Sequence, residues 1–271
     1  MSASSKVLSR GDYWFNLLAH SGRTVSELCA SVKAADSQLN GRQVRFIAVV
    51  PDANNHYPRA RQGEVGLLEG WTLAKIVQQV IEQDADLSEK RAIVAVIDVT
   101  SQAYGRREEA FGIHQALAGA AGAYAQARLA GHPVIGLIVG KAMSGAFLAH
   151  GYQANKLIAF NDPAVMIHAM GKESAARITL RSVEALEKLA ATIPPMAYDI
   201  EHYSSLGLLS QLMNIANPDS ASAEDIARVQ AAITQAIKEV EEQGVYLVDR
   251  LGATNRASSS TVRELMRQQW Q

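Results

Sequence analysis

The feature that most constrains the fold is an apolar segment followed directly by a run of small residues. Residues 133–139 (PVIGLIV) are apolar and largely β-branched, and residues 140–146 (GKAMSGA) are mostly small. This pattern predicts a buried strand, a tight turn and a short helix, in that order. Because the first N–H groups of a helix have no partner within it, the order places backbone donors at the end of a buried strand.

Gly145 and Ala146 carry the N–H groups that we expect to bind an anionic oxygen. Neither has a large side chain, so a substrate carbonyl can approach the main chain closely. A turn without a ligand is the alternative interpretation, because strand-to-helix turns rich in Gly and Ala are common in α/β proteins. The expected role of the preceding Ser144 is to cap the helix N-terminus.

Ser144 could instead be a nucleophile, with Lys141 or His168 as its base. The G-x-S-x-G sequence of a nucleophile elbow is absent, however, because Ala142 and Ala146 stand at the two glycine positions. This absence favours the capping role over covalent catalysis.

The remainder of the chain alternates apolar strands with amphipathic helices, which is typical of an α/β protein. We expect strands over residues 44–50, 91–99, 133–139, 156–160 and 164–168, and helices over residues 66–84, 108–130, 171–212, 226–240 and 261–270, with Pro194–Pro195 breaking the third and Ser222 capping the fourth. The order predicts an N-terminal helical segment (1–43), a central domain (44–215) and a C-terminal helical extension (216–271).

A second loop, residues 100–105 (TSQAYG), follows the predicted strand 91–99. Ligands of α/β proteins gather at the carboxyl ends of strands, so this loop is expected to face residues 140–146. Two amide-rich turns in that arrangement could hold two oxygens of one substrate. They suit chemistry through an enolate, in which negative charge develops on a thioester oxygen.

Bulk properties exclude several classes of function. A formal net charge of −1 argues against a nucleic-acid binder, which needs a basic surplus. The single cysteine, Cys29, excludes an internal disulfide and a multi-cysteine metal site, and the acidic residues show no metal-ligand spacing. With no apolar run of about 18 residues and no signal-peptide core, we expect a cytoplasmic protein that does not bind a membrane.

Residues 44–171 resemble the crotonase-like carboxyltransferase domains of acyl-CoA carboxylases. The resemblance rests on the loop Val99–Gly105 (VTSQAYG), the segment Gly140–Ala146 (GKAMSGA) and the order of strands and helices around them. When Tyr13–Phe15 (YWF) and Tyr152–Asn155 (YQAN) are included, the sequence is more similar to the gamma subunits of biotin-independent malonate decarboxylases. The resemblance covers about three quarters of the chain, and Gly140–Ala146 is its most specific part.

The resemblance implies a crotonase-like ββα superhelix with flanking N- and C-terminal helices. It also implies a complex with a homologous beta subunit, an acyl-carrier protein subunit and an acyl-carrier transferase subunit. A malonyl thioester would lose CO2 there to give an acetyl thioester. The CoA-derived prosthetic group would belong to the carrier, with no cofactor on this chain. By the same resemblance, the oxyanion is held by the amides of Gly145, Ala146 and Gly105.

Decarboxylation needs no base, but the enolate later needs a proton. His150 and His168 follow the 140–146 turn along the chain and are candidate donors, although buried histidines more often have structural roles. His114 lies on an apolar helix face and is expected in the core or an interface.

The chain has two alternative functions: a biotin-dependent carboxyltransferase subunit or a non-catalytic scaffold subunit. Biotin-dependent relatives have a Gly-Gly pair after the serine. This chain has Gly145-Ala146 there, which argues against transfer to biotin.

Overall fold

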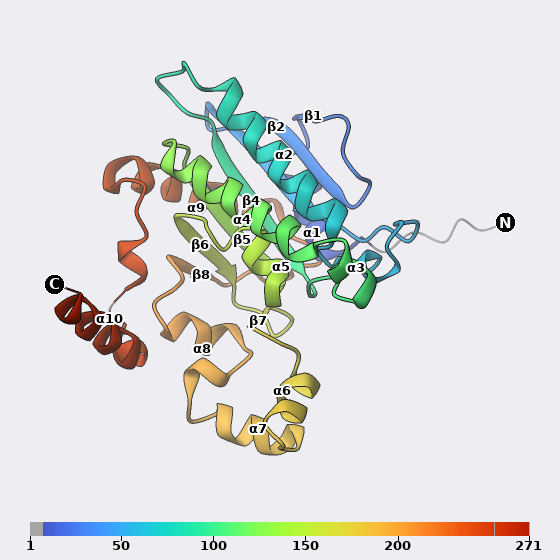
Figure 1. The fold of residues 1–271 in the computed structure, drawn as a ribbon. Coiled ribbons are helices and arrows are strands. Elements are labelled where there is room, and N and C mark those ends of the chain that lie inside the picture. The colour runs from blue at the N-terminus through green and yellow to red at the C-terminus, as the bar shows by residue number, and fades with distance from the viewer. Residues whose placement is uncertain (1–7, 252, 271) are drawn as a thin grey trace.

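A computed structural model describes residues 8–251 and 253–270 of the chain, which form one mixed α/β fold around an eight-stranded sheet (Figure 1). The strands are β1 Arg23–Thr24, β2 Val32–Leu39, β3 Arg42–Val49, β4 Ala92–Val99, β5 Val134–Met143, β6 Lys156–Phe160, β7 Met166–His168 and β8 Gln211–Met213. Along the sheet the order is β1-β2-β3-β4-β5-β6-β8, and β7 pairs with the far end of β5. The pairs β1–β2 and β2–β3 are antiparallel and all later pairs are parallel.

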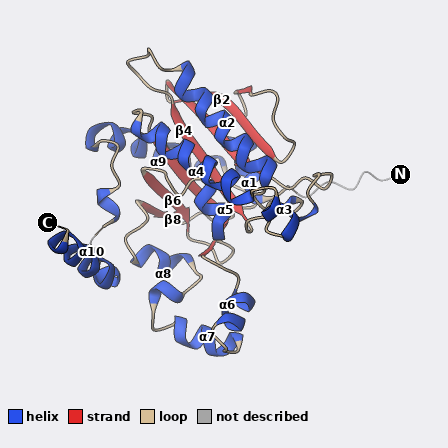
Figure 2. Cartoon of the chain, in the orientation of Figure 1, coloured by secondary structure: helices blue, strands red, loops and turns tan. Residues whose placement is uncertain are grey.

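Helices cover the sheet, and several more helices extend from it (Figure 2). The α-helices are α1 Arg10–Leu18, α2 Leu67–Gln83, α3 Arg106–Ala110, α4 Ile113–Leu129, α5 Ser144–Ala149, α6 Lys172–Ile178, α7 Val183–Ala190, α8 Ile200–Ser205, α9 Ala223–Gln243 and α10 Ala257–Gln269. Short 3-10 helices span Pro58–Ala60, Pro194–Met196, Val248–Arg250 and Thr254–Arg256. Helices α2 and α4 pack together across one face of the sheet, whereas α1 and α9 contact both the sheet and each other.

The core lies on the two central parallel strands, as the sequence predicts. Ala92–Ile97 of β4 and Val134–Val139 of β5 are buried along their whole length, except that Gly136 has no side chain to bury. Parallel strands covered on both faces are expected to be continuous apolar runs, which is the pattern of both segments. A Cβ at Gly136 would lie 2.5 Å from Leu157 Cδ2, so this position of β5 needs glycine for close packing.

The N-terminal segment differs from the sequence prediction beyond its first helix. Helix α1 is present, but residues 23–24 and 32–39 form strands β1 and β2, where a second helix was the expectation. Strand β2 continues into β3 through Asn40–Gly41, two residues with positive φ (50° and 82°). An Asn-Gly turn between two extended segments favours a tight hairpin, and this local signal decides the structure here.

Four other predicted boundaries are wrong. The helix expected over 108–130 is divided into α3 and α4, because Gly112 adopts a left-handed conformation with φ 81°. Strand β5 continues to Met143 instead of ending at Val139. The region 171–212 ends in a strand, β8, and α10 begins at Ala257.

The other predicted strands and the helices near residues 66–84 and 226–240 are confirmed, with Ser222 capping α9. One hydrophobic core contains residues from all three predicted parts of the chain, 1–43, 44–215 and 216–271. The division into these three domains stays a prediction. No helix in the described residues is long and apolar enough to cross a membrane.

Candidate functional site

The chain turns directly from β5 into α5 at Ser144, which has a φ of 57°. A left-handed conformation is uncommon for a residue with a side chain and is held here by neighbouring contacts. The Ser144 hydroxyl donates to the carbonyl oxygen of Ala169 at 2.8 Å, which ties the turn to the loop after β7. The prediction that Ser144 caps the helix is wrong, because Met143 occupies the N-cap position and Ser144 is already the first residue of α5.

The N–H of Gly145 donates a hydrogen bond to the side-chain oxygen Oε1 of Gln102 at 2.8 Å. Gln102 belongs to the loop that follows β4, so the two loops expected to face each other do meet here. The donor is therefore not free, but its partner is a side-chain carboxamide rather than a main-chain carbonyl. Gln102 carries no local sequence signal for this role, because its partner lies 43 positions along the chain.

A buried carboxylate fixes the backbone near Gln102. Glu69, at the start of α2, is fully buried and accepts hydrogen bonds from the Gly66 N–H (2.9 Å), the Asn55 side-chain amide (2.7 Å) and the Ser31 hydroxyl. These contacts hold the segment that ends at Val65. Val65 in turn forms a parallel bridge with Gln102, through its N–H to Ser101 O (3.0 Å) and its carbonyl to Ala103 N (2.8 Å).

Gly145 also lines a cavity of about 320 Å³. Its walls come from α5, the end of β7, the segment after α7 and helix α8: Ser144, Gly145, Phe147, Leu148, Tyr152, Ile167, His168, Ala169, Pro194, Pro195, Ala197, Tyr203, Leu206 and Leu208. These lining residues, all in the described part of the chain, include no Asp, Glu, Lys or Arg. The cavity is thus a mainly apolar space that carries no charged side chain.

His168 is placed at this cavity by β7. Strand β7 pairs with the end of β5 so that His168 lies opposite Met143, next to the turn. Its Nδ1 lies 3.0 Å from Met170 O and 3.2 Å from Met170 N, and its ring stacks on Tyr198 with 3.9 Å between ring centroids. Burial lowers the pKa of His168, so the imidazole is neutral at neutral pH.

His150 is a structural residue, and its candidacy as a proton donor is wrong. It is fully buried, its Nδ1 lies 3.0 Å from the Tyr124 hydroxyl, and its Nε2 lies 3.1 Å from Val96 O. Burial lowers its pKa to about 4, which keeps the ring neutral. His114 is exposed rather than in the core; a role for it in an interface stays a prediction.

Gly105 and Ala146, both described by the structure, do not line the cavity. Gly105 precedes α3, and a Cβ there would lie 2.4 Å from Glu108 Oε2 and 2.5 Å from Arg59 Nε, so a larger residue would displace these two side chains. Ala146 is fully buried behind the turn. Of the five predicted site residues, the structure therefore brings Ser144, Gly145 and His168 together at one cavity. Within the described residues, no cluster of three or more His, Cys, Asp or Glu side chains could hold a metal ion.

Known proteins resemble this chain in both sequence and structure. A family model described as malonate decarboxylase gamma subunit matches residues 60–270. The malonyl-S-ACP:biotin-protein carboxyltransferase MADD of Malonomonas rubra is 30% identical over 244 residues, which cover 89% of this chain and 80% of that protein.

The structural comparison agrees with the sequence comparison. A chain of the Pseudomonas malonate decarboxylase hetero-tetramer in complex with coenzyme A is 60% identical, with a TM-score of 0.94 over 97% of this chain and 100% of that chain. A chain of the Pseudomonas MdcD-MdcE hetero-dimer is 56% identical, with a TM-score of 0.90 over 97% and 99%.

The transcarboxylase 12S structure shares the fold at 18% identity, with a TM-score of 0.61 over 84% of this chain and 42% of that one. The predicted crotonase-like α/β fold is confirmed by these neighbours. The family match covers the cavity, the turn and the C-terminal helices, and the chain belongs to the malonate decarboxylase gamma subunit family.

Proposed function

We propose that this chain works with a homologous beta subunit to remove CO2 from a malonyl thioester carried by an acyl-carrier subunit. The observation that carries the proposal is the Gly145 N–H at the wall of an apolar cavity, with a carbonyl-type oxygen already bound to it. A thioester oxygen has the same acceptor chemistry as that carboxamide oxygen.

In this mechanism the thioester oxygen accepts the hydrogen bond from Gly145. The bond between the α-carbon and the carboxylate breaks, CO2 leaves, and the electron pair forms an enolate whose charge lies on the thioester oxygen. A backbone donor aimed at that oxygen contributes about 3 kcal/mol to the transition state. The apolar lining helps because it disfavours the charged carboxylate relative to uncharged CO2.

The enolate then takes a proton at carbon to give the acetyl thioester. His168 borders the cavity and is the candidate donor of that proton. It would deliver the proton directly or through a water molecule that it binds. The Ser144 hydroxyl has no base as its partner; its one hydrogen bond within the described residues is to Ala169 O. This geometry supports a main-chain site over a serine nucleophile.

The prosthetic group of this proposal is CoA-derived and belongs to the acyl-carrier subunit. The cavity suits an uncharged acyl group and the thioester beside it, because its walls are apolar and Gly145 supplies the donor. With no Lys or Arg among the lining residues, which all belong to the described chain, phosphates of the prosthetic group would lie outside the cavity. An acyl-carrier transferase subunit would load the carrier, and the assembly would act in the cytoplasm.

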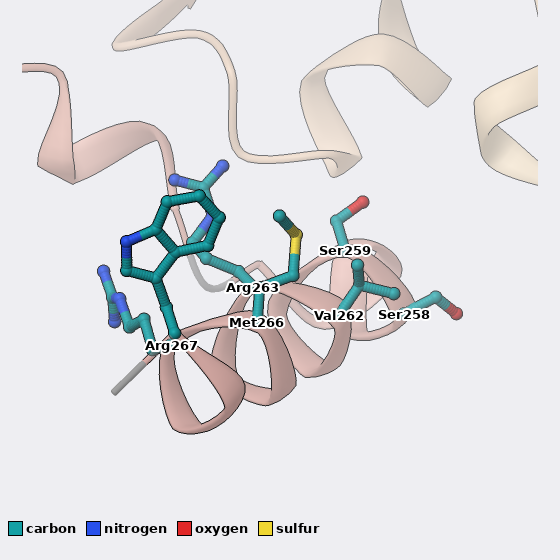
Figure 3. A pocket seen from close by; sticks show the side chains of 7 residues that line it. Ser258, Ser259, Val262, Arg263, Met266 and Arg267 are labelled. Carbon is teal, nitrogen blue, oxygen red and sulfur yellow. The ribbon is translucent and has the colours of Figure 1, made fainter.

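Helix α10 supports the proposed association with the beta subunit. None of its residues is buried; Met266 is 59% exposed and Trp270 is 87% exposed. Val262 and Met266 project from the same side of the helix (Figure 3), beside an open space of about 790 Å³. Exposed apolar patches of this kind mark interfaces between proteins. We propose that the beta subunit covers this face of α10.

CO2 release from malonyl-carrier tests the proposed activity. The complex of this chain with its beta subunit should release CO2 without biotin, and adding avidin should change nothing. Turnover that depends on biotin would favour the carboxyltransferase alternative. Replacing Gly145 by proline, which removes the N–H, should lower kcat by about a hundredfold or more. Full activity of that variant would support the scaffold alternative.

A pair of lysine substitutions tests the proposed interface. Met266→Lys should weaken association with the beta subunit in a pull-down, because it places a charge on the apolar face of α10. Gln268→Lys is the matched control, since Gln268 lies on the same helix away from the open space and should leave association unchanged. Equal association of both variants with the beta subunit would contradict the proposed interface.

A further inference from the structure

Gln102 occupies the position that the proposed mechanism gives to the thioester oxygen. Its Oε1 lies 2.8 Å from the Gly145 nitrogen, a full-strength hydrogen-bond distance. We infer that Gln102 is a displaceable acceptor: it holds the Gly145 N–H while the site is empty, and the thioester oxygen must replace it. This inference rests on the proposed function, because it needs Gly145 to be the donor to substrate.

The two acceptors exclude each other at Gly145. One N–H makes one well-aligned hydrogen bond, and a second acceptor sharing it would give two weak ones. The carboxamide also lies directly against the glycine: a Cβ on Gly145 would be 3.3 Å from Gln102 Oε1 and 3.5 Å from Cδ. A substrate atom on that side of Gly145 would therefore overlap the Gln102 side chain unless the side chain moved.

The contacts of Gln102 allow such a movement. Its main chain is fixed by the bridge to Val65, which the buried Glu69 supports from the start of α2. Its half-buried side chain makes a single hydrogen bond in the described structure, to Gly145. Rotation of the side chain therefore breaks one contact and leaves the loop in place.

The exchange has a measurable consequence for affinity. In the empty site, Gln102 satisfies a half-buried N–H that would otherwise lack a partner. Entering substrate gains a hydrogen bond at Gly145 but breaks an existing one, so the net gain in binding free energy is smaller. Removing the competing acceptor should tighten thioester binding by about two- to tenfold, the equivalent of one net hydrogen bond.

The test uses the complete complex with the beta subunit. Gln102→Ala removes the acceptor. Gln102→Asn keeps an amide but withdraws it by one methylene. Both should lower KM for malonyl-carrier, and the Kd of acetyl-pantetheine as probe, by about two- to tenfold, with kcat changed by about twofold at most. Gln102→Glu should raise both constants, because a carboxylate binds an N–H more strongly than an amide does. Gln126→Ala, an exposed glutamine of α4, is the control.

A merely structural role for Gln102 would lower the unfolding temperature without lowering the Kd, so thermal unfolding is measured for each variant. The inference that the thioester oxygen replaces Gln102 would be overturned if Gln102→Ala and Gln102→Asn complexes released CO2 normally but had an unchanged or raised Kd. That outcome would leave the proposed function standing. Absence of CO2 release from the wild-type complex would instead overturn the proposed function.

Discussion

Replacing Ser144 by alanine separates main-chain catalysis from covalent catalysis at this site. The Ser144 hydroxyl donates to Ala169 O at 2.8 Å and has no other hydrogen bond within the described residues. Its loss should lower the free energy of unfolding by about 1 kcal/mol. The left-handed backbone at φ 57° is equally accessible to serine and alanine, so no further strain is added.

The expected kinetic effect of Ser144→Ala is small. If the N–H of Gly145 stabilises the enolate, kcat for malonyl-carrier should stay within about tenfold of wild type, because removal of one side-chain hydrogen bond shifts the turn only slightly. Removal of a nucleophilic serine costs about a millionfold. The assay is CO2 release by the complex with the beta subunit, with the unfolding temperature measured in parallel.

Ser144→Gly is the matched control. Glycine adopts the left-handed conformation without strain, which offsets by about 1 kcal/mol the lost hydrogen bond to Ala169. Its unfolding free energy should therefore lie close to that of wild type, and its kcat close to that of Ser144→Ala. A loss of a thousandfold or more in either variant, with native unfolding temperature, would refute the main-chain mechanism.

Three further predictions concern the scaffold of the site. Trp14 is fully buried against Phe160, and its Nε1 donates to Pro218 O at 2.8 Å. Trp14→Ala should therefore lower the free energy of unfolding by about 3–5 kcal/mol in denaturant titrations, and a loss below about 1 kcal/mol would contradict this packing. Glu69→Ala should remove the acceptor of three hydrogen bonds and speed proteolysis of the loop before Val65; an unchanged cleavage rate would count against the anchoring role. Burial lowers the pKa of His150 from 6.5 to about 4, so the unfolded chain binds the proton more readily than the folded chain. Stability should therefore fall as the pH falls from 6.5 to 4, and His150→Gln should reduce this pH dependence in thermal melts.

The central part of the fold was predictable because its signals are local. Ala92–Ile97 of β4 and Val134–Val139 of β5 are continuous apolar runs, and both are buried. Helix α9 follows the spacing of its apolar residues from Ile226 to Val240 and the cap at Ser222. By contrast, β8 has three residues and no pattern of its own; its pairing with β6 makes it a strand.

The site was only partly predictable, for the same reason. Sequence spacing places Gly145 directly after a strand, and the structure confirms that local order. His150 is much nearer to Gly145 in sequence than His168 is. The pairing of β7 with β5 nevertheless carries His168 to the cavity, whereas His150 is fully buried elsewhere. The Gln102 contact to Gly145 depends on two loops meeting across the sheet, which no local pattern encodes.

The central claim is that the Gly145 N–H binds the thioester oxygen. The most direct measurement is a structure of the complex with the beta subunit and a ketone analogue of the acetyl thioester, in which CH2 replaces sulfur. The account predicts the ketone oxygen at about 2.7–3.1 Å from the Gly145 nitrogen, with Gln102 Oε1 moved away. A bound analogue whose oxygen is held elsewhere, with Gln102 still on Gly145, would contradict it.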